Sequence, residues 1–324
     1  MIVSESNGHM VREVGRRRIE ELPEGDLLIN VKYSSLNYKD AMSATGNRGV
    51  TKRYPHTPGI DAAGVVVTSE NGDFARGDEV VVTGYDLGMN TPGGFGRYIR
   101  VPADWVVKKP QGLTLRECMT YGTAGFTAGL SLYKLEAAGV TPDDGDILVT
   151  GASGGVGSMA VAILAKAGYR VCAATGKSEQ HEFLKRLGAA EILSRKEVDD
   201  KSKRPLLPQR WAGVVDVVGG NILTAAIKST KRNGSVTTCG LTQSADLNTT
   251  VYPFILRGVN LLGINSADTR MPVRRQIWQN LAGDWRPEML AEIGTDRSLE
   301  ELDSEIEEIL NGRVSGRIVV DLDR

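Results

Sequence analysis

The feature that most constrains the fold is a glycine-rich stretch, GASGGVG (residues 151–157). The apolar run before it, DILV, is typical of a buried strand, and the Ala-rich run after it is typical of a helix that ends at Gly168. Small residues at such a turn let backbone N–H groups reach a pyrophosphate and let the helix pack close to the sheet. A glycine-rich stretch alone more often marks a turn. Between a strand and a helix it predicts dinucleotide binding, here as A-x-G-x-x-G because Ala152 replaces the first glycine.

Strand-like and helix-like runs alternate downstream of this stretch. The apolar runs YRVCAAT, EILS, GVVDVVG, SVTTCGL and VNLLGINS are separated by helical segments such as SEQHEFLKRLGA. Parallel neighbours need a crossover connection, so this alternation predicts a parallel sheet that is covered on both faces. The fold class is therefore α/β, with a doubly wound Rossmann cofactor domain.

The region upstream is different, because residues 26–107 contain short β-branched runs between glycine- and proline-rich turns. This pattern predicts a compact β-rich unit with irregular loops and without a helix of ordinary length. Helical patterning starts only at residues 117–140, and a charged helix and a terminal strand, GRIVVDL, close the chain. We expect the nucleotide domain to be inserted between the β-rich part and a C-terminal segment that returns to it.

Composition excludes several classes of protein. The chain of 324 residues has 39 Lys and Arg against 40 Asp and Glu, so its net charge gives no sign of a polyanion-binding surface. The three cysteines, Cys118, Cys172 and Cys239, have neither disulfide-framework nor zinc-site spacing. The N-terminal residues lack the pattern of a secretory signal, and no apolar run approaches the roughly 20 residues of a membrane span. These features predict a soluble, cytoplasmic protein.

The residues that follow the second strand of the nucleotide domain predict the cofactor. An NAD enzyme places a carboxylate there to bind the ribose hydroxyls, but this chain has Thr175-Gly176-Lys177. Lys177 supplies a cation, and Arg195 supplies a planar guanidinium after the third strand. The sequence therefore favours NADPH over NADH. The alternative is that Lys177 only solvates a surface loop.

Longer runs resemble a known family. The runs SSLNYKDAMSATG (residues 34–46), PHTPGIDAAGVV (residues 55–66), residues 122–177 and VYPFILRGVNLLGINS (residues 251–266) are similar to the zinc-independent quinone-oxidoreductase branch of the medium-chain dehydrogenase/reductase superfamily. Within that branch they most resemble the YhdH/YhfP group, which includes an NADPH-dependent acrylyl-CoA reductase. The resemblance implies a GroES-like substrate domain (residues 1–120 and 268–324), a Rossmann NADPH-binding domain (residues 121–267) and a homodimer.

Zinc-dependent relatives carry a Gly-His-Glu element where this chain has Gly59-Ile60-Asp61. The chain has only three histidines, His9, His56 and His181, and none has a partner at ligand spacing. The sequence therefore predicts no catalytic metal. Without a Lewis acid, alcohol dehydrogenation is less plausible than reduction of a conjugated C=C bond or of a quinone.

The resemblance also implies the site residues. Asn37, Tyr38 and Asp40 are the candidate catalytic residues. Tyr38 either donates a hydrogen bond and a proton or only packs on the cofactor, since tyrosine hydroxyls stay protonated at neutral pH. The candidate cofactor residues are Tyr38, Ser153, Gly154, Gly155, Val156, Thr175, Gly176, Lys177, Arg195, Leu241, Ile264, Ser266 and Asn311.

These features favour NADPH-dependent reduction of an activated C=C bond, such as that of acrylyl-CoA. Quinone reduction on the same fold and a non-catalytic NADPH-binding sensor are the alternatives.

Two basic groups could bind the phosphates of coenzyme A, although such clusters are usually only solvated. They are Arg48, Lys52 and Arg53, and Arg270, Arg274 and Arg275. The apolar run at residues 259–266 reads as the last strand of the parallel sheet, hence as an edge that could pair with a second copy. Burial of this run within the chain is the alternative.

Overall fold

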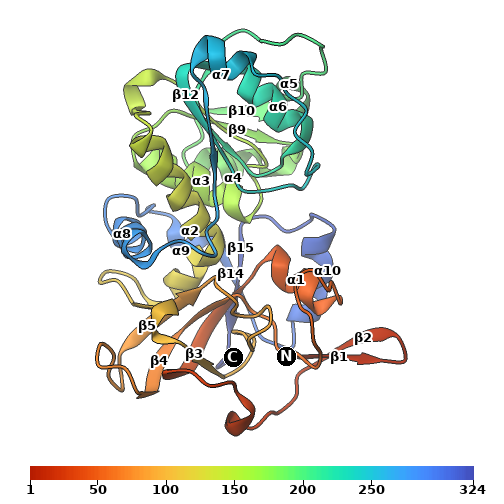
Figure 1. Cartoon of the computed structure of the whole chain (residues 1–324), viewed down its shortest axis with the longest axis vertical. Coiled ribbons are helices and arrows are strands. Elements are labelled where there is room, and N and C mark those ends of the chain that lie inside the picture. The colour runs from red at the N-terminus through yellow and green to blue at the C-terminus, as the bar shows by residue number, and fades with distance from the viewer. The chain divides into compact units, whose positions relative to one another are not determined.

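The structure, a computed structural model, describes all 324 residues, which divide into two compact units (Figure 1). Unit 1 contains Met1–Thr123, Ala267–Ala282 and Leu290–Arg324. Unit 2 contains Ala124–Ser266 and Gly283–Met289. None of the helices is both long and apolar enough to cross a lipid bilayer.

Unit 2 is built on a six-stranded sheet in which every neighbouring pair is parallel. The strand order is β10-β9-β8-β11-β12-β13, so the chain reverses direction across the sheet between β8 and β11. This arrangement confirms the predicted doubly wound fold and places a ligand crevice at the carboxyl ends of the strands. The strands are β8 (Ile147–Val149), β9 (Val171–Thr175), β10 (Glu191–Ser194), β11 (Trp211–Asp216), β12 (Thr230–Thr238) and β13 (Asn260–Gly263).

Helices connect these strands, as the alternating pattern predicted. Leu148, Val214 and Val236 of the central strands pack with Ile222 and Ile227 of α6 in one buried cluster. Complete burial of such a side chain contributes about 1.5–3 kcal/mol. The helices are α3 (Gly155–Lys166), α4 (His181–Arg186), α5 (Arg195–Val198), α6 (Gly220–Ser229) and α7 (Tyr252–Arg257), with 3-10 turns η3 (Pro142–Asp144) and η4 (Ser178–Gln180).

Unit 1 is built on a seven-stranded sheet of order β14-β15-β3-β4-β5-β7, in which β6 also pairs with β3. All of its pairs are antiparallel except β14 with β15. The C-terminal strand β15 pairs with β3, so the end of the chain lies in the same sheet as its N-terminal part. The strands are β3 (Leu27–Leu36), β4 (Asp61–Ser69), β5 (Glu79–Thr83), β6 (Tyr98–Val101), β7 (Val106–Lys108), β14 (Gly294–Arg297) and β15 (Arg317–Asp321).

Several short elements surround this sheet. An N-terminal hairpin joins β1 (Ile2–Ser6) to β2 (His9–Glu13). The helices are α1 (Tyr38–Ala44), α8 (Met271–Ala282), α9 (Leu290–Ile293) and α10 (Leu302–Leu310), with 3-10 turns η1 (Ile19–Glu21) and η2 (Ala103–Trp105).

The region predicted to lack a helix of ordinary length contains a short one, because Tyr38 begins the seven-residue helix α1. Asn37 and Asp40 form a capping box at its start, and the sequence pattern Asn-x-x-Asp is the signal that could have revealed it. The helix is too short to show a 3.6-residue period.

Helix α2 (Leu115–Ala137) spans the boundary between the units and contains one non-helical residue, Gly122, at φ 48° and ψ −154°. A Cβ atom on Gly122 would lie 2.5 Å from Asp61 Oδ2 and from Ser35 Oγ. Only glycine adopts this backbone conformation without strain, and only glycine leaves room for the two side chains. The kink in α2 therefore depends on a glycine at position 122.

Candidate active site and cofactor site

Asp40 fixes the start of α1. Its Oδ2 accepts a hydrogen bond from the Asn37 backbone N–H at 2.8 Å, and its Oδ1 accepts from the N–H groups of Gly59 and Ile60 at 3.1 and 2.8 Å. Asp40 is fully buried, and burial, followed by the charge of Asp61, raises its pKa to about 7. Asp40 therefore joins α1 to the Gly59-Ile60 segment and presents no atom at the surface.

Asp61, the first residue of β4, lies at the centre of a buried polar network. Its Oδ2 accepts hydrogen bonds from Ser35 Oγ at 2.6 Å, Asn37 Nδ2 at 2.7 Å and the Thr123 backbone N–H at 2.8 Å. Its Oδ1 accepts from Thr123 Oγ1 at 2.6 Å. The same carboxylate thus orients Asn37, which caps α1, and the backbone that follows the Gly122 kink.

Arg317, the first residue of β15, supplies the cation of this network. Its Nη2 lies 3.8 Å from Asp61 Oδ2 and donates to Ser35 Oγ at 2.8 Å. Its other donors reach the carbonyl oxygens of Thr120 and Leu36, both at 3.2 Å. Burial lowers the pKa of Arg317, and the neighbouring carboxylates oppose that effect. Neither Asp61 nor Arg317 was predicted from the sequence as a functional residue, because only the fold brings them together.

Tyr38 lies at the N-terminus of α1 and is the exposed member of the predicted catalytic group. Half of its side chain (50%) is exposed, whereas Asn37 and Asp40 are buried. Tyr38 is therefore accessible to a ligand. The buried carboxylates of Asp40 and Asp61 hold its helix in place.

The glycine-rich stretch forms a tight turn between β8 and α3. A Cβ on Gly157 would lie 2.3 Å from the Gly151 carbonyl oxygen, so α3 packs directly against the turn. A Cβ on Gly154, by contrast, would meet only that same oxygen at 3.5 Å, which leaves open space beside the first amides of α3. A helix N-terminus with open space beside a glycine suits a phosphate group.

The predicted phosphate-binding residues lie together beside this turn. Ser153 Oγ and Thr175 Oγ1 are hydrogen-bonded at 3.0 Å, and the Lys177 N–H donates to Thr175 Oγ1 at 3.1 Å. A Cβ on exposed Gly176 would lie 3.4 Å from Arg195 Nη2, so the guanidinium lies over this glycine. Burial lowers the pKa of Lys177, and Glu179 opposes this shift. The structure thus brings the Ser153 and Thr175 hydroxyls and the Arg195 guanidinium together at the end of β9, where Lys177 follows.

The other predicted cofactor residues are more scattered. Gly155 and Val156 begin α3. Leu241 follows β12 and is 66% exposed, and the Ile264 N–H donates to the Thr238 carbonyl at 3.0 Å beyond the end of β13. Ser266 is the last residue of the long segment of unit 2. Asn311 belongs to unit 1, where its Nδ2 donates to the Glu307 carbonyl at 2.7 Å and caps the end of α10.

A cavity of about 260 Å³ lies at the same edge of the parallel sheet, beside the start of α6. Gln243 Oε1 accepts a hydrogen bond from the Ile222 N–H at 3.1 Å and so caps this helix. The lining is entirely of small or polar residues: Gly220, Asn221, Thr224, Gln243, Ser244, Asp246 and Asn248. These residues follow the carboxyl ends of β11 and β12.

The structure corrects the expectation for Arg274. Its side chain is only 1% exposed, and its Nη atoms donate to the carbonyl oxygens of Thr83 at 2.8 Å and Ala267 at 2.9 Å. The guanidinium also stacks over the Tyr85 ring at 4.6 Å. Arg274 therefore fixes the backbone of unit 1 and is not available to a coenzyme A phosphate.

The other basic group consists of Arg48, Lys52 and Arg53, and one of its members already has partners within the protein. Arg48 pairs with Glu5 and lies over the Tyr54 ring at 4.8 Å. Lys52 and Arg53 are exposed.

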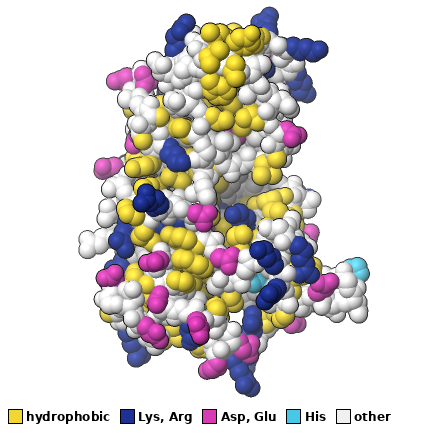
Figure 2. Space-filling model, in the orientation of Figure 1, with side chains coloured by type: hydrophobic (Ala, Val, Ile, Leu, Met, Phe, Trp, Pro, Cys, Tyr) yellow, Lys and Arg dark blue, Asp and Glu magenta, His cyan; other side chains and the backbone are white.

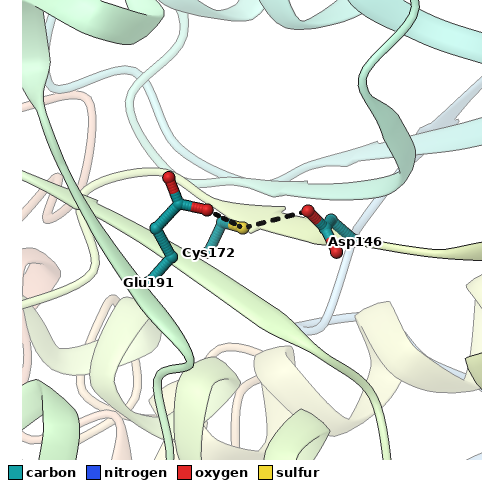
Figure 3. A group of neighbouring side chains, drawn as sticks. All are labelled: Asp146, Cys172 and Glu191. Atoms are coloured by element: carbon teal, nitrogen blue, oxygen red, sulfur yellow. Dashed lines mark hydrogen bonds between the residues drawn. The ribbon is translucent and has the colours of Figure 1, made fainter.

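A second polar cluster lies at the amino ends of β8, β9 and β10, where Cys172 Sγ is 3.6 Å from carboxylate oxygens of Asp146 and Glu191 (Figure 3). These are residue types that bind metal ions. However, Arg170 pairs with Asp146 at 2.7 Å, Arg210 pairs with Glu191 at 3.3 Å, and burial raises the pKa of Cys172 to about 12. The carboxylates already have cationic partners, so this cluster is a set of ion pairs. It lies at the opposite edge of the sheet from the glycine-rich turn.

Each unit contains a region that matches a known protein family. Residues 23–111 match the alcohol dehydrogenase GroES-like domain, and residues 155–283 match the family described as zinc-binding dehydrogenase. Unit 1 therefore contains the predicted GroES-like domain, and unit 2 the Rossmann-type domain.

Individual relatives cover nearly the whole chain. YhfP of Bacillus subtilis (strain 168), which is named for quinone oxidoreduction, is 47% identical over 94% of this chain and 92% of its own length. The acrylyl-CoA reductase AcuI of Ruegeria pomeroyi is 43% identical over 98% of this chain and 96% of its own length.

Solved structures give the same result. The yhdH oxidoreductase of Salmonella enterica in complex with NADP superposes with a TM-score of 0.96 at 43% identity, over 99% of this chain and 98% of that one. B. subtilis yhfP with NAD bound superposes with a TM-score of 0.97 at 44% identity, with the same coverage. The chain thus belongs to the medium-chain dehydrogenase/reductase family of oxidoreductases, in the group that contains YhfP and AcuI.

Proposed function

We propose that the protein reduces a C=C bond conjugated to a carbonyl group, with NADPH as the reductant and a short enoyl-CoA such as acrylyl-CoA as the substrate. The observation that carries the cofactor assignment is the group of Thr175, Lys177 and Arg195 at the end of β9, where NAD enzymes place a carboxylate for the ribose hydroxyls and this chain has Thr175-Gly176-Lys177. The substrate assignment is supported by the likeness to AcuI and by the exposed Tyr38.

The residues of unit 2 fit a phosphorylated dinucleotide. The open space beside Gly154 and the first amides of α3 would hold the pyrophosphate, and Ser153 and Thr175 provide hydroxyl groups next to it. Lys177 and Arg195 would hold the 2′-phosphate. When bound, NADPH supplies a hydride.

The residues of unit 1 would act on the substrate. The Tyr38 hydroxyl donates a hydrogen bond to the thioester carbonyl oxygen, where negative charge develops, and is the candidate proton donor to the α-carbon. Asn37 and Asp40 keep α1 in place, and Asp61 with Arg317 fixes Asn37. We therefore assign Asp40 a positioning role, because it is fully buried.

The test is NADPH consumption with acrylyl-CoA, crotonyl-CoA and a benzoquinone, repeated with Tyr38→Phe. If Tyr38 transfers the proton, Tyr38→Phe lowers kcat for the enoyl-CoA substrates by about 100-fold or more and leaves NADPH affinity unchanged. If Tyr38 only packs, kcat is unchanged. Tight NADPH binding without turnover of any alkene would support the non-catalytic sensor instead.

Quinone reduction is the second candidate function. It is favoured by the engagement of Arg48 and Arg274 within the protein, which leaves fewer cations for the phosphates of coenzyme A. Arg275 remains exposed, so Arg275→Ala separates the two functions. It should raise KM for acrylyl-CoA more than KM for benzoquinone if the enoyl-CoA is the substrate, whereas equal changes would favour the quinone.

We also propose a homodimer through the open edge of the parallel sheet. β13 has a neighbour on one side only, and an uncovered strand edge pairs readily with another chain. Figure 2 shows hydrophobic side chains gathered over α7, which precedes β13, and Val251, Ile255 and Leu256 are 62%, 68% and 50% exposed. Light scattering after gel filtration should give a dimer, and Ile255→Lys should give a monomer.

The proposed location is the cytoplasm. The three cysteines are all free thiols, as expected in a reducing compartment, and Cys118 and Cys172 are buried. Fractionation of the source cells, with the protein detected by an antibody, tests this location.

A further inference from the structure

Asp216, the last residue of β11, is a buried carboxylate at the carboxyl edge of the parallel sheet, where its side chain is fully excluded from solvent. β11 lies between β8 and β12. The side chain at the end of this strand can therefore contact the ends of both neighbours.

Neutral donors from three segments meet at this carboxylate. Thr150 Oγ1 donates to Oδ1 at 2.8 Å, the Gly219 N–H donates to Oδ2 at 2.9 Å and Thr238 Oγ1 donates to Oδ2 at 3.3 Å. Thr150 Oγ1 also accepts from the Val217 N–H at 3.0 Å, which extends the network by one backbone group. No lysine or arginine forms a salt bridge with Asp216.

Each of these segments leads into the cofactor site. Thr150 immediately precedes the glycine-rich turn, Thr238 precedes the loop that contains Leu241, and Gly219 is the N-cap residue of α6 beside the cavity. The Ile264 N–H donates to the Thr238 carbonyl, so the last predicted cofactor segment is linked to the same point. A buried acceptor that joins strand ends in this way fixes their spacing, because an unmade bond would leave a buried donor without a partner.

We propose that Asp216 is a positioning residue for the dinucleotide: it sets the distance between the pyrophosphate turn after β8 and the nicotinamide-facing loop after β12. The proposal rests on the NADPH assignment above. It predicts that substitution of Asp216 weakens the binding of a ligand that spans both loops. The affinity for a ligand that binds only to Thr175, Lys177 and Arg195 at the end of β9 should change little.

The test compares the binding of NADPH with that of 2′-AMP, which carries the 2′-phosphate alone. Thr238→Val removes one donor to Asp216 and keeps the side-chain shape. Thr237→Val is the control, because Thr237 precedes Thr238 on the same strand, is fully buried, and donates instead to the Val214 carbonyl at 3.0 Å. Asp216→Asn is the stronger variant, since an amide cannot accept at both oxygen positions.

We expect Asp216→Asn to raise the Kd for NADPH by about tenfold or more and Thr238→Val by a smaller factor. The Kd for 2′-AMP should change less than about threefold in both variants, and Thr237→Val should leave both affinities unchanged. The proposal is overturned if Asp216→Asn binds NADPH like the wild type, or if both ligands weaken equally. Failure of the wild type to bind NADPH would refute the proposed function instead, so the two failures are distinguishable.

Discussion

A buried carboxylate lies at the centre of a polar network in each unit, Asp61 in unit 1 and Asp216 in unit 2, but the two have different partners. Asp61 of unit 1 accepts from three side chains and one backbone group and has the Arg317 guanidinium beside it. Asp216 of unit 2 accepts only from hydroxyl and backbone N–H groups. A buried ion pair is strongly destabilised when one partner is removed, whereas a carboxylate held by neutral donors has no single partner on which it depends.

The two networks also support different parts of the protein. The Asp61 network fixes a kinked backbone and the start of a short helix, both of which need rigid support. The Asp216 network joins loops that must accept a large ligand. Substitutions in the first network should therefore act mainly on stability, and substitutions in the second mainly on cofactor binding.

The largest expected effect is that of Gly122→Ala. The added Cβ would lie 2.5 Å from Asp61 Oδ2, and the residue would keep a positive φ. Steric overlap and backbone strain together should lower the free energy of unfolding by about 4 kcal/mol. Urea denaturation of Gly139→Ala is the control, since Gly139 has φ 87° but nothing within 4 Å of an added Cβ. A similar loss for both variants would show that crowding around Asp61 is unimportant.

Arg317→Met should lower the free energy of unfolding by about 3 kcal/mol, because it leaves the Asp61 charge buried without a cation. The double variant with Asp61→Asn should recover part of that loss, since no buried charge then remains. Thermal and urea unfolding of the two variants measure the difference. The single variant Asp61→Asn is measured as well. If the free-energy losses of the two single variants simply add up in the double variant, the two side chains are not coupled.

Thr123→Val should lower the free energy of unfolding by about 2 kcal/mol, because it removes the 2.6 Å hydrogen bond to the Asp61 carboxylate. Thr237→Val, which removes a bond to a neutral carbonyl, should lower it by about 1 kcal/mol. Equal losses would mean that the charge of Asp61 does not strengthen its hydrogen bonds.

Asp40 should make stability depend on pH, by at most about 1.4 kcal/mol per pH unit for one proton. Its pKa is raised from 3.8 to about 7 in the folded protein, so the folded state binds more protons than the unfolded state between these values. Its contribution to stability is therefore largest at low pH and falls as pH rises through this window. Asp216, whose pKa burial also raises, acts with the same sign. Urea unfolding at several pH values should show a shallower decline for Asp40→Asn, and an unchanged slope would contradict the raised pKa.

Much of unit 2 could be predicted, because continuous apolar strands, glycine turns and alternating helices are local patterns. The cluster of Thr175, Lys177 and Arg195 also followed from position, since consecutive parallel strands end at the same edge. Unit 1 was less predictable. Helix α1 is too short for its period to be visible, and β14 (GTDR) contains one β-branched residue and no apolar alternation.

The Asp61 network could not be read from the sequence for a different reason. Asp61, Thr123 and Arg317 are far apart in the chain, and antiparallel pairing and the Gly122 kink bring them together. Likewise, Arg274 looked like a surface cation beside Arg275. The two occupy adjacent positions of α8, and the helix directs one inward and the other to solvent.

In the proposed reaction, hydride from NADPH is delivered to the β-carbon of an enoyl thioester. The most direct test is turnover of acrylyl-CoA with NADPH dideuterated at C4 of the nicotinamide, followed by NMR of the product. The proposed reaction should give propionyl-CoA with deuterium at the β-carbon and a solvent-derived proton at the α-carbon. The absence of labelled propionyl-CoA, with the deuterated cofactor oxidised only when a quinone is present, would contradict it.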